Sequence, residues 1–410
     1  CVNCSESHHP PYCPNPDCEY HSLGFDREQC GSSIRHAHRG LRSIFWIKKG
    51  WDQRVYSDPV QRFQCKTCRR KFNFSVFTIN YRFQIRGQIN SKIFFRAVHN
   101  RSNRSIAREL GVSEWLVRRR ISQIARFGLI QHFCYLERLK INEPIAYDGL
   151  ECFARSQYEP NNINQAIGVD SLFCYTFNFA PLNRKGRMSD RQKHHLEKLE
   201  VLEGRFNPKA TRIASAELFE ELVSRIDPRS EKLILLTDEH FQYRRAIVRD
   251  LSPKTRAKIE HRTVSSKETR NYKNILFAVN HMDLLIRRYV AAFTRETICF
   301  SKNHSAMLEK FVLHMCYKNY MKPQFVKTHK RDPDSNTHSP AMKLGLTNRV
   351  LLFHDFFVAP TKKINPKLVG EKMPECWKLL LKNEVAFERE FKFCRKKKKF
   401  SNKLAFKEIN

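Results

Sequence analysis

The sequence has few glycines, no long apolar run and far fewer acidic than basic residues. Only 13 glycines occur in 410 residues, and no glycine-rich loop is present, so a site for a nucleotide triphosphate is not expected. No apolar run approaches the roughly 18 residues that a membrane-spanning helix needs. The chain opens at Cys1 without an apolar, signal-like segment, which predicts an intracellular protein that does not bind membranes.

Positive charge is what the sequence has in excess. Lysine and arginine number 75 against 41 aspartates and glutamates, which gives a formal net charge of +34. Such an excess repels itself in the folded chain and favours a polyanionic partner. Hydrophobic residues make up 41% of the chain and aromatic residues 12%, which argues against disorder. A purely adhesive or ribosome-like basic protein is the alternative interpretation of the charge.

Two cysteine pairs lie far apart in the first 85 residues. Cys13 and Cys18 belong to "CPNPDC", whereas Cys65 and Cys68 belong to "CKTC". Two closely spaced pairs on either side of a hairpin match the ligand spacing of a tetrahedral structural zinc. In an intracellular chain, cysteines are more often metal ligands than disulfide partners. We therefore predict a zinc ribbon over residues 1–85, with four unrelated buried cysteines as the alternative.

Further cysteines and histidines in this region raise the possibility of a second zinc site. Their spacing matches no established ligand pattern, so the sequence leaves this site open. The residues concerned are Cys1, Cys4, Cys30, His8, His9, His21, His36 and His38.

A helical segment is expected over residues 86–140. Within it, "NRSIARELGVSEWLVRRRISQIARF" has the form of a helix-turn-helix. Gly111 falls in the turn, and Ser113 is the expected N-cap of the second helix. The apolar residues spaced to form the buried stripe of that helix are Val117, Ile121 and Ile124.

The other faces of the second helix are basic and polar. At about 100° per residue, five side chains are expected to point away from the core. They are Trp115, Arg118, Arg119, Ser122 and Arg126. An exposed arginine face on the second helix is what reading of the DNA major groove requires. Arg120 falls at the flank of the stripe, where an apolar residue is more usual, and an ordinary helical hairpin with a solvated basic face is the alternative.

Residues 141–330 alternate between strand-like and helix-like segments. Three strand-like stretches come first, and the first of them is expected to end at Asp148. A polar, helix-favouring insertion follows at about 183–229, and the next strand ends at Asp238. A short strand then leads to a long expected helix, "NILFAVNHMDLLIRRYVAAFTRE", which contains Asp283.

This order of elements is similar to that of RNase H-like α/β domains, in which the first strand, the fourth strand and a late helix each contribute a carboxylate. The matching residues here are Asp148, Asp238 and Asp283. Three carboxylates that converge on one point repel one another unless cations are bound. Two Mg²⁺ or Mn²⁺ ions relieve this repulsion, and they also suit phosphoryl transfer. Oxygen-only ligands suit these ions and do not suit zinc held by thiolates.

Other roles and other ligands stay open at this site. Asp148 and Asp238 are alternatively capping or salt-bridged strand ends, and Asp283 is alternatively paired with Arg287 on its own helix. Four further acidic residues are rival ligands: Glu239, Asp170, Glu260 and Glu268. Asp170 follows an apolar run, but "GVDS" is expected at a turn between strands.

Several longer motifs carry a resemblance to a known family. They are "DGLECFARSQYEPNNINQAIGVDS", "LNRKGRMSDRQKHHLEKLE", "TDEHFQYRRAI", "VNHMDLLIRRYVAAFTRETICFSKN", "YKNYMKP" and "HSPAMKLGL". Together they resemble the DDE-type transposases of bacterial insertion sequences in which a zinc ribbon and a helix-turn-helix precede the catalytic core. Many such enzymes have Glu as the third acid, where this sequence has Asp283.

The resemblance implies a metal-dependent polynucleotidyl transferase. Such an enzyme binds double-stranded DNA at the terminal inverted repeats of its element, cuts it and transfers the strand end to target DNA. The resemblance also implies a bacterial cytoplasmic protein associated with the nucleoid. The reaction processes two DNA ends together, so we expect a homo-oligomer on DNA.

The last segment, residues 331–410, begins with the linker-like "RDPDSNTHSP" and is rich in lysine. The run Arg395–Lys399 is expected to contact DNA phosphates or to form a solvated tail. The expected fold class is thus multidomain α+β: zinc ribbon, helix-turn-helix, RNase H-like catalytic core with a helical insertion, and a basic C-terminal region. Two other functions stay open, a nuclease of the same fold that cuts without strand transfer and a DNA-binding regulator that has lost catalysis.

Overall fold

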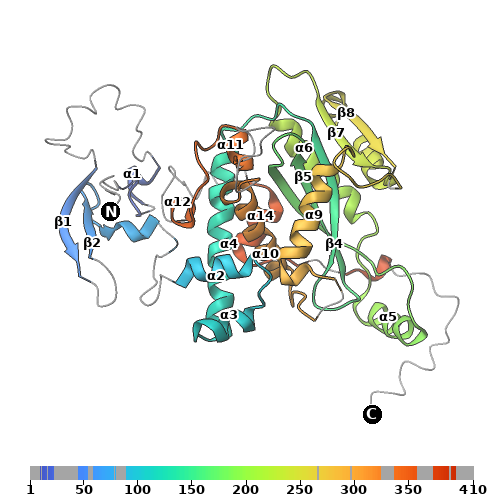
Figure 1. Ribbon diagram of the computed structural model, residues 1–410, viewed down its shortest axis with the longest axis horizontal. Coiled ribbons are helices and arrows are strands. Elements are labelled where there is room, and N and C mark those ends of the chain that lie inside the picture. Colours follow the sequence, from blue (N-terminus) through green and yellow to red (C-terminus); the bar gives the residue numbers. More distant parts are fainter. Residues whose placement is uncertain are drawn as a thin grey trace, which may run out of the picture.

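The structure is a computed structural model with two β-sheets and many helices (Figure 1). It describes residues 10, 12–15, 17–22, 45–53, 59–77, 79, 89–265, 267–295, 298–324, 337–357, 373–386 and 389–393. The run Arg395–Lys399 lies outside these residues. Of the residues considered for a second zinc site, only the backbone of His21, in the short helix α1 (Glu19–Ser22), is described.

The first sheet lies near the N-terminus and has three antiparallel strands in the order β1-β2-β3. Their bounds are Trp46–Asp52, Val60–Cys65 and Lys71–Asn73. Aromatic rings pack against one another beside this sheet: the Phe63 ring lies 5.0 Å from that of Trp46 and 5.9 Å from that of Phe72. These rings and the cysteines form a hydrophobic core of their own. This core gives the cysteine pairs a fixed platform.

Three helices follow, and the last two occupy the segment that the sequence predicts to be a helix-turn-helix. Their bounds are α2 Ile89–Ala97, α3 Asn103–Leu110 and α4 Glu114–Leu136. Gly111 ends α3 in the left-handed conformation, at φ 61°, which a residue without a Cβ adopts most readily. The side chain of Ser113 caps α4 by accepting the Leu116 N–H at 3.2 Å, so the expected N-cap is confirmed.

Helix α4 is buried along more of its surface than the sequence pattern suggested. The expected stripe of Val117, Ile121 and Ile124 is buried, and so is Arg120. Gly128 lies so close to a second helix that an added Cβ would be 3.0 Å from the Cys316 sulfur. That second helix is α10 (His304–Cys316), and it packs along α4.

The packing of α10 corrects the expected orientation of two side chains. Ser122 donates its hydroxyl to Glu309 at 2.5 Å, and Arg126 donates to the same carboxylate oxygen at 3.1 Å. Both residues therefore point into the interface with α10 and not toward solvent. The periodicity located the face but could not show that another helix covers its C-terminal half. Only Trp115, Arg118 and Arg119 of the five are exposed.

The second sheet has five strands in the order β6-β5-β4-β7-β8. Their bounds are β4 Ile145–Phe153, β5 Pro160–Gly168, β6 Cys174–Pro181, β7 Leu233–Asp238 and β8 Ile259–Val264. The strands β4, β5 and β6 are antiparallel neighbours, whereas β7 pairs parallel to β4 and β8 pairs parallel to β7. The first strand of this domain in sequence is therefore the central strand of its sheet.

Helices cover both faces of this sheet. Side chains alternate between the faces along a strand. The Asn178 side chain donates to the Ala214 carbonyl of α6 (Ala210–Ser224), so α6 lies on one face. Asn178 pairs with Asn164 of β5. Gln165, the next residue of β5, contacts α9 (Phe277–Tyr289) on the other face. In Figure 1, α9 runs in front of the central strands. Of the two edge strands, β6 is buried along its whole length, whereas β8 has exposed residues.

The remaining helices surround this core. Their bounds are α5 Asp190–Glu203, α7 Phe241–Arg245, α8 Pro253–Ala257, α11 Pro340–Lys343, α12 Phe353–Phe357 and α14 Glu375–Lys382. Short 3-10 segments occur at Phe74–Phe77, Ala291–Phe293 and Phe391–Phe393, and π-helical turns at Ala246–Asp250 and Tyr317–Met321. Helix α5, in the predicted insertion, projects away from the sheet (Figure 1). No helix of the described part is long and apolar enough to span a membrane.

One hydrophobic core joins the helix-turn-helix to the five-stranded sheet. It contains Ile106 of α3, Val117 of α4 and Tyr147 of β4, and it continues to Trp377 of α14. Residues expected to form separate segments on either side of position 140 thus share one interior. Helix α4 is part of that interior and does not stand on a separate module.

Candidate functional site

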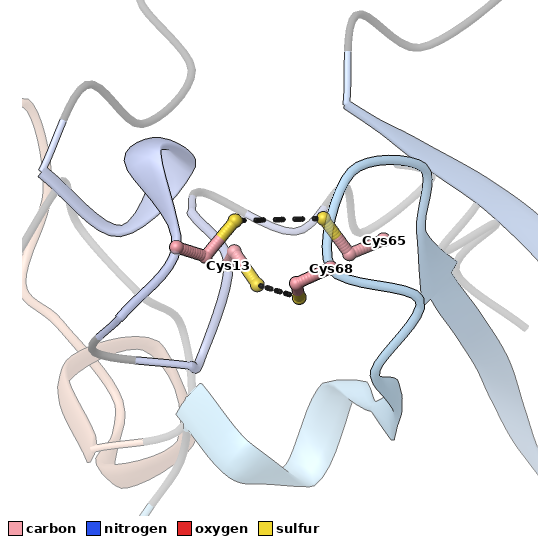
Figure 2. Close-up of side chains that lie close together, drawn as sticks. Cys13, Cys65 and Cys68 are labelled. Atoms are coloured by element: carbon pink, nitrogen blue, oxygen red, sulfur yellow. Dashed lines mark hydrogen bonds between the residues drawn. The ribbon is translucent and has the colours of Figure 1, made fainter.

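Four cysteine side chains meet beside the N-terminal sheet, at the positions expected from the sequence. The sulfur of Cys13 lies 3.5 Å from that of Cys68, and the sulfur of Cys18 lies 3.8 Å from that of Cys65. All four sulfur atoms lie within 4.8 Å of one another. The labelled side chains point toward a common centre from two separate loops (Figure 2).

These distances are those of a tetrahedral metal site. A zinc–sulfur bond of about 2.3 Å places the sulfur atoms of a tetrahedron about 3.8 Å apart. The Cys18 N–H donates to the Asn15 carbonyl, and the Cys65 N–H donates to the Arg70 carbonyl, so a tight turn presents each pair. The cluster can therefore hold a structural metal such as zinc.

The second set of candidate residues is the three aspartates of the larger sheet. Ile145 pairs with Leu235 and Ala146 with Leu236, an offset of 90 residues in both cases (235 − 145 and 236 − 146). The same offset places Asp238, the last residue of β7, level with Asp148 on the neighbouring strand. Asp148 in turn pairs directly with Gln165 of β5. The side chain of Gln165 donates to Asp283 of α9.

Two details of the expected local structure are wrong. Asp148 does not end its strand, because β4 continues to Phe153 through its pairing with β5. What ends near Asp148 is the pairing with β7, so the carboxylate lies where two neighbouring strands separate. The helix that carries Asp283 ends at Tyr289, and Val290 has extended dihedral angles. Phe293 is buried and belongs to the 3-10 segment that follows.

Asp148 is held by two hydrogen bonds, one from its own strand and one from α7. Its Oδ1 accepts the Gly149 N–H at 2.7 Å and the Tyr243 hydroxyl of α7 at 3.2 Å. Gly149 is required here, because a Cβ at that position would lie 2.2 Å from the Asn162 side chain. Tyr243 is not among the site residues predicted from the sequence, although it follows Asp238 by little more than one helical turn.

Gln165 is the second residue with no role in the sequence-based predictions. It is fully buried, and while its Nε2 donates to Asp283, its Oε1 has no hydrogen-bond partner among the described residues. A buried acceptor without a partner is uncommon in folded proteins. The only sign in the sequence is a polar residue in the middle of a strand-like stretch.

The charges of the aspartates affect one another. Burial raises the pKa of Asp148 to about 6, and the Asp238 carboxylate raises it as well. Burial likewise raises the pKa of Asp283 to about 7, with the Asp148 carboxylate as the second cause. The charge of Arg270 opposes the increase in the pKa of both groups. The three aspartates are thus near enough for mutual repulsion to disfavour full ionisation.

The carboxylates are less closely gathered than the cysteines. Among the described residues, the four cysteines are the only group of three or more His, Cys, Asp or Glu side chains whose ligand atoms all lie within 4.8 Å of one another. Among the described residues, Asp283 and Arg287 do not form the ion pair that was the alternative role of Asp283. Arg287 instead donates to the Glu151 carbonyl at 2.9 Å.

The rival acidic residues lie elsewhere or are solvated. Asp170 is in the turn between β5 and β6, as expected. Its N–H donates to Glu143, so it lies beside the start of β4, at the end of that strand opposite to Glu151. Glu260 pairs with Arg262 on its own strand at 2.5 Å. Glu239 and Glu268 are exposed.

The exposed end of α4 forms the third candidate site. Trp115 is 62% exposed, and the guanidinium of Arg119 lies 5.2 Å from its ring centroid. Arg118 is exposed beside them. We call these three residues the α4 surface. Its cations and its flat aromatic side chain are groups that can contact nucleic acid.

Comparison with protein-family models gives no match for the chain, and neither does comparison with curated protein sequences.

Removing ligands from the cysteine cluster should remove one metal ion per chain. We expect the double substitution Cys65→Ser, Cys68→Ser to lower the zinc content by one ion and to unfold the small sheet, because its core is built around the cluster. Elemental analysis of the purified full-length chain measures the first effect, and near-UV circular dichroism the second. Cys376→Ser, outside the cluster, is the control and should keep the wild-type zinc content. Unchanged zinc in the double variant would contradict the assignment.

The raised pKa of Asp283 predicts a pH-dependent stability in buffer without Mg²⁺ or Mn²⁺. An aspartate whose pKa is about 7 in the folded protein and 3.8 when unperturbed favours folding while it is protonated. This contribution is complete below about pH 4 and is lost as the pH rises through 7. Asp283→Asn should therefore melt at about the wild-type temperature at low pH and at a higher temperature above pH 7. Thermal unfolding across this range tests it, with Asp170→Asn as the control; a difference that does not change with pH would contradict it.

Proposed function

We propose that the chain is a DDE-type transposase that binds the ends of a mobile DNA element and catalyses metal-dependent strand cleavage and strand transfer. The observation that carries this proposal is the meeting of Asp148, Asp238 and Asp283 at one place in the five-stranded sheet. They come from the central strand, its parallel neighbour and a helix on one face, and the first and third have raised pKa values. The strand order β6-β5-β4-β7-β8 supports an RNase H-like core, because its first three strands are antiparallel and the next two are parallel.

The carboxylate cluster fits Mg²⁺ or Mn²⁺ in its chemistry. Its ligands are oxygen atoms, which these ions prefer, and its negative charges repel one another in the absence of a cation. The buried Oε1 of Gln165, which has no hydrogen-bond partner among the described residues, would supply a further oxygen acceptor beside the carboxylates. The carboxylates do not converge on one point as closely as the cysteines do, but a pair of ions about 4 Å apart needs a wider set of ligands than a single ion does.

The residues of the chain divide the expected work between them. Asp148, Asp238 and Asp283 would hold the ions, which when bound activate the attacking oxygen and stabilise the leaving oxygen of the phosphodiester. Tyr243 and Gln165 orient Asp148 and Asp283 through their hydrogen bonds. The Tyr243 hydroxyl stays a neutral donor, because burial raises its pKa well above 10.

DNA binding is assigned to the basic surfaces. The formal charge of +34 favours DNA at every surface, but such attraction alone is not specific for sequence. The α4 surface projects from the N-terminal end of a helix whose other end is buried beside the sheet. The three-stranded sheet beside the cysteine cluster supplies further exposed cations at Lys48 and Lys49. We assign recognition of the element ends to these two parts together.

Removing any one carboxylate charge should abolish cleavage and preserve the fold. Asp148→Asn, Asp238→Asn and Asp283→Asn should each lower the rate of DNA cleavage by about 10³-fold or more, because each removes a ligand of the ions. Double variants should be little worse than single ones, since the three act as a unit. Activity should require Mg²⁺ or Mn²⁺ and fail with Ca²⁺, whose longer and looser coordination misplaces the attacking oxygen.

The substrate for this experiment is plasmid DNA that carries the sequences flanking the gene, with cut and joined products separated on a gel. Asp170→Asn is the matched control and should cleave at the wild-type rate. Normal cleavage by Asp148→Asn would exclude the assigned chemistry. Cut products without any joined to target DNA would identify a nuclease of the same fold in place of a transposase.

The α4 surface should distinguish one DNA sequence from another. Arg118→Ala or Arg119→Ala should weaken binding to the element ends by about 1–3 kcal/mol and binding to random DNA by less. Fluorescence anisotropy with both DNAs at one salt concentration measures the difference. Lys254 is an exposed cation on α8, and Lys254→Ala should weaken binding to both DNAs slightly and to the same extent. An equal loss on both DNAs for the arginine variants would mean that they contact only phosphates.

A further inference from the structure

One exposed loop connects the strand that pairs with Asp238 to the helix that carries Asp283. Strand β8 ends at Val264, which pairs with Asp238. Helix α9 begins at Phe277, and Asp283 lies in its second turn. The residues between them therefore run from the level of one carboxylate to the helix that presents another. We call the part from Lys267 to Lys273 the rim loop.

The rim loop has a defined conformation because asparagine side chains hold it. Asn274, which is buried, donates to the Thr269 carbonyl at 3.1 Å and accepts the Leu276 N–H at 2.8 Å. Asn271 accepts the Lys273 N–H at 2.9 Å. These bonds fix the base of the loop, so the side chains between them face solvent without a large entropy cost on binding.

The rim loop exposes an aromatic ring and three cations. Tyr272 is 76% exposed, and its ring has the Lys273 ammonium 5.9 Å from its centroid. Lys267, Arg270 and Lys273 are exposed, and Glu268 is the one acidic residue of the loop. Arg270 lies midway along this loop, between Val264, which pairs with Asp238, and the helix that carries Asp283.

This combination suits a nucleotide better than it suits a protein surface. A DNA phosphate that approaches the aspartates is repelled by their charge, and a cation at the rim offsets that repulsion. An open aromatic ring offers a stacking surface to a base. Bases inside a duplex already stack on their neighbours, so only a base that has left the duplex can use the ring.

We propose that the rim loop binds an unpaired nucleotide next to the phosphate that is cut, with its base stacked on Tyr272 and its phosphate held by Arg270. This rests on the proposed function, because it takes the aspartates as the place of cleavage. It adds that the enzyme opens or frays the DNA at the cut site and retains one base outside the duplex. The loop would then prefer DNA ends with a single-stranded extension to blunt ends.

The test compares a blunt, fluorescein-labelled duplex with the same duplex carrying a short single-stranded overhang. Anisotropy titrations in buffer without Mg²⁺ or Mn²⁺ measure binding while cleavage is prevented. Wild-type protein should bind the overhang DNA about tenfold more tightly, which is the range of one stacked base. Tyr272→Ala should remove the preference, and Tyr272→Phe should retain it because the ring remains. Phe391→Ala, which removes an exposed ring on another element, is the matched control and should also retain it.

Each outcome decides the proposal. A wild-type protein without the preference, or a Tyr272→Ala variant that keeps it, would overturn it, and loss of the preference in Tyr272→Phe would exclude stacking. The result is also separable from the proposed function. If the wild-type protein cleaves DNA but the Tyr272 variants show that binding does not depend on Tyr272, only the proposal for the rim loop is rejected. If the preference depends on Tyr272 but the wild-type protein cleaves no DNA, only the proposed enzymatic function is rejected.

Discussion

Like charges that share a partly buried place in a fold repel one another, and the five-stranded sheet keeps three of them together. The backbone makes this possible: parallel pairing of β4 and β7 places Asp148 and Asp238 at the same level, and α9 brings Asp283 to Gln165. Burial and, to a lesser extent, this repulsion raise the pKa values of Asp148 and Asp283. Tyr243, Gln165 and Arg270 all oppose this increase.

Helix α4 joins the candidate DNA-reading surface to the hydrophobic core of the five-stranded sheet. Its first turns carry Trp115, Arg118 and Arg119, and its later turns are fastened to α10 through Glu309. Burial raises the pKa of Glu309, and the hydrogen bonds from Ser122 and Arg126 oppose that increase. Because one helix belongs to both parts, DNA bound at its exposed end would lie at a fixed distance from the aspartates. The three-stranded sheet has its own small core, and its cysteine cluster replaces the apolar area that so few residues cannot supply.

The sequence by itself determined the features that depend on local spacing. The two cysteine pairs, the Gly111 turn, the Ser113 cap, the buried stripe of α4 and the strand that ends at Asp238 are all present. Each is set by residues within a few positions of one another, where turn preference, helical periodicity and strand alternation act directly. The candidate aspartates could be named for the same reason, since each follows or lies in a strongly patterned element.

The tertiary structure alone decided how distant segments cover and complete these elements. Ser122 and Arg126 fit an exposed face by periodicity, yet both donate hydrogen bonds to Glu309 of α10, more than 180 residues later in the sequence. Asp148 lies within its strand because β5 continues the pairing beyond the end of β7. Gln165 and Tyr243 acquire their roles only where strands and helices meet. Periodicity reports which side of an element is apolar, whereas long-range packing determines which polar side chains end up facing one another.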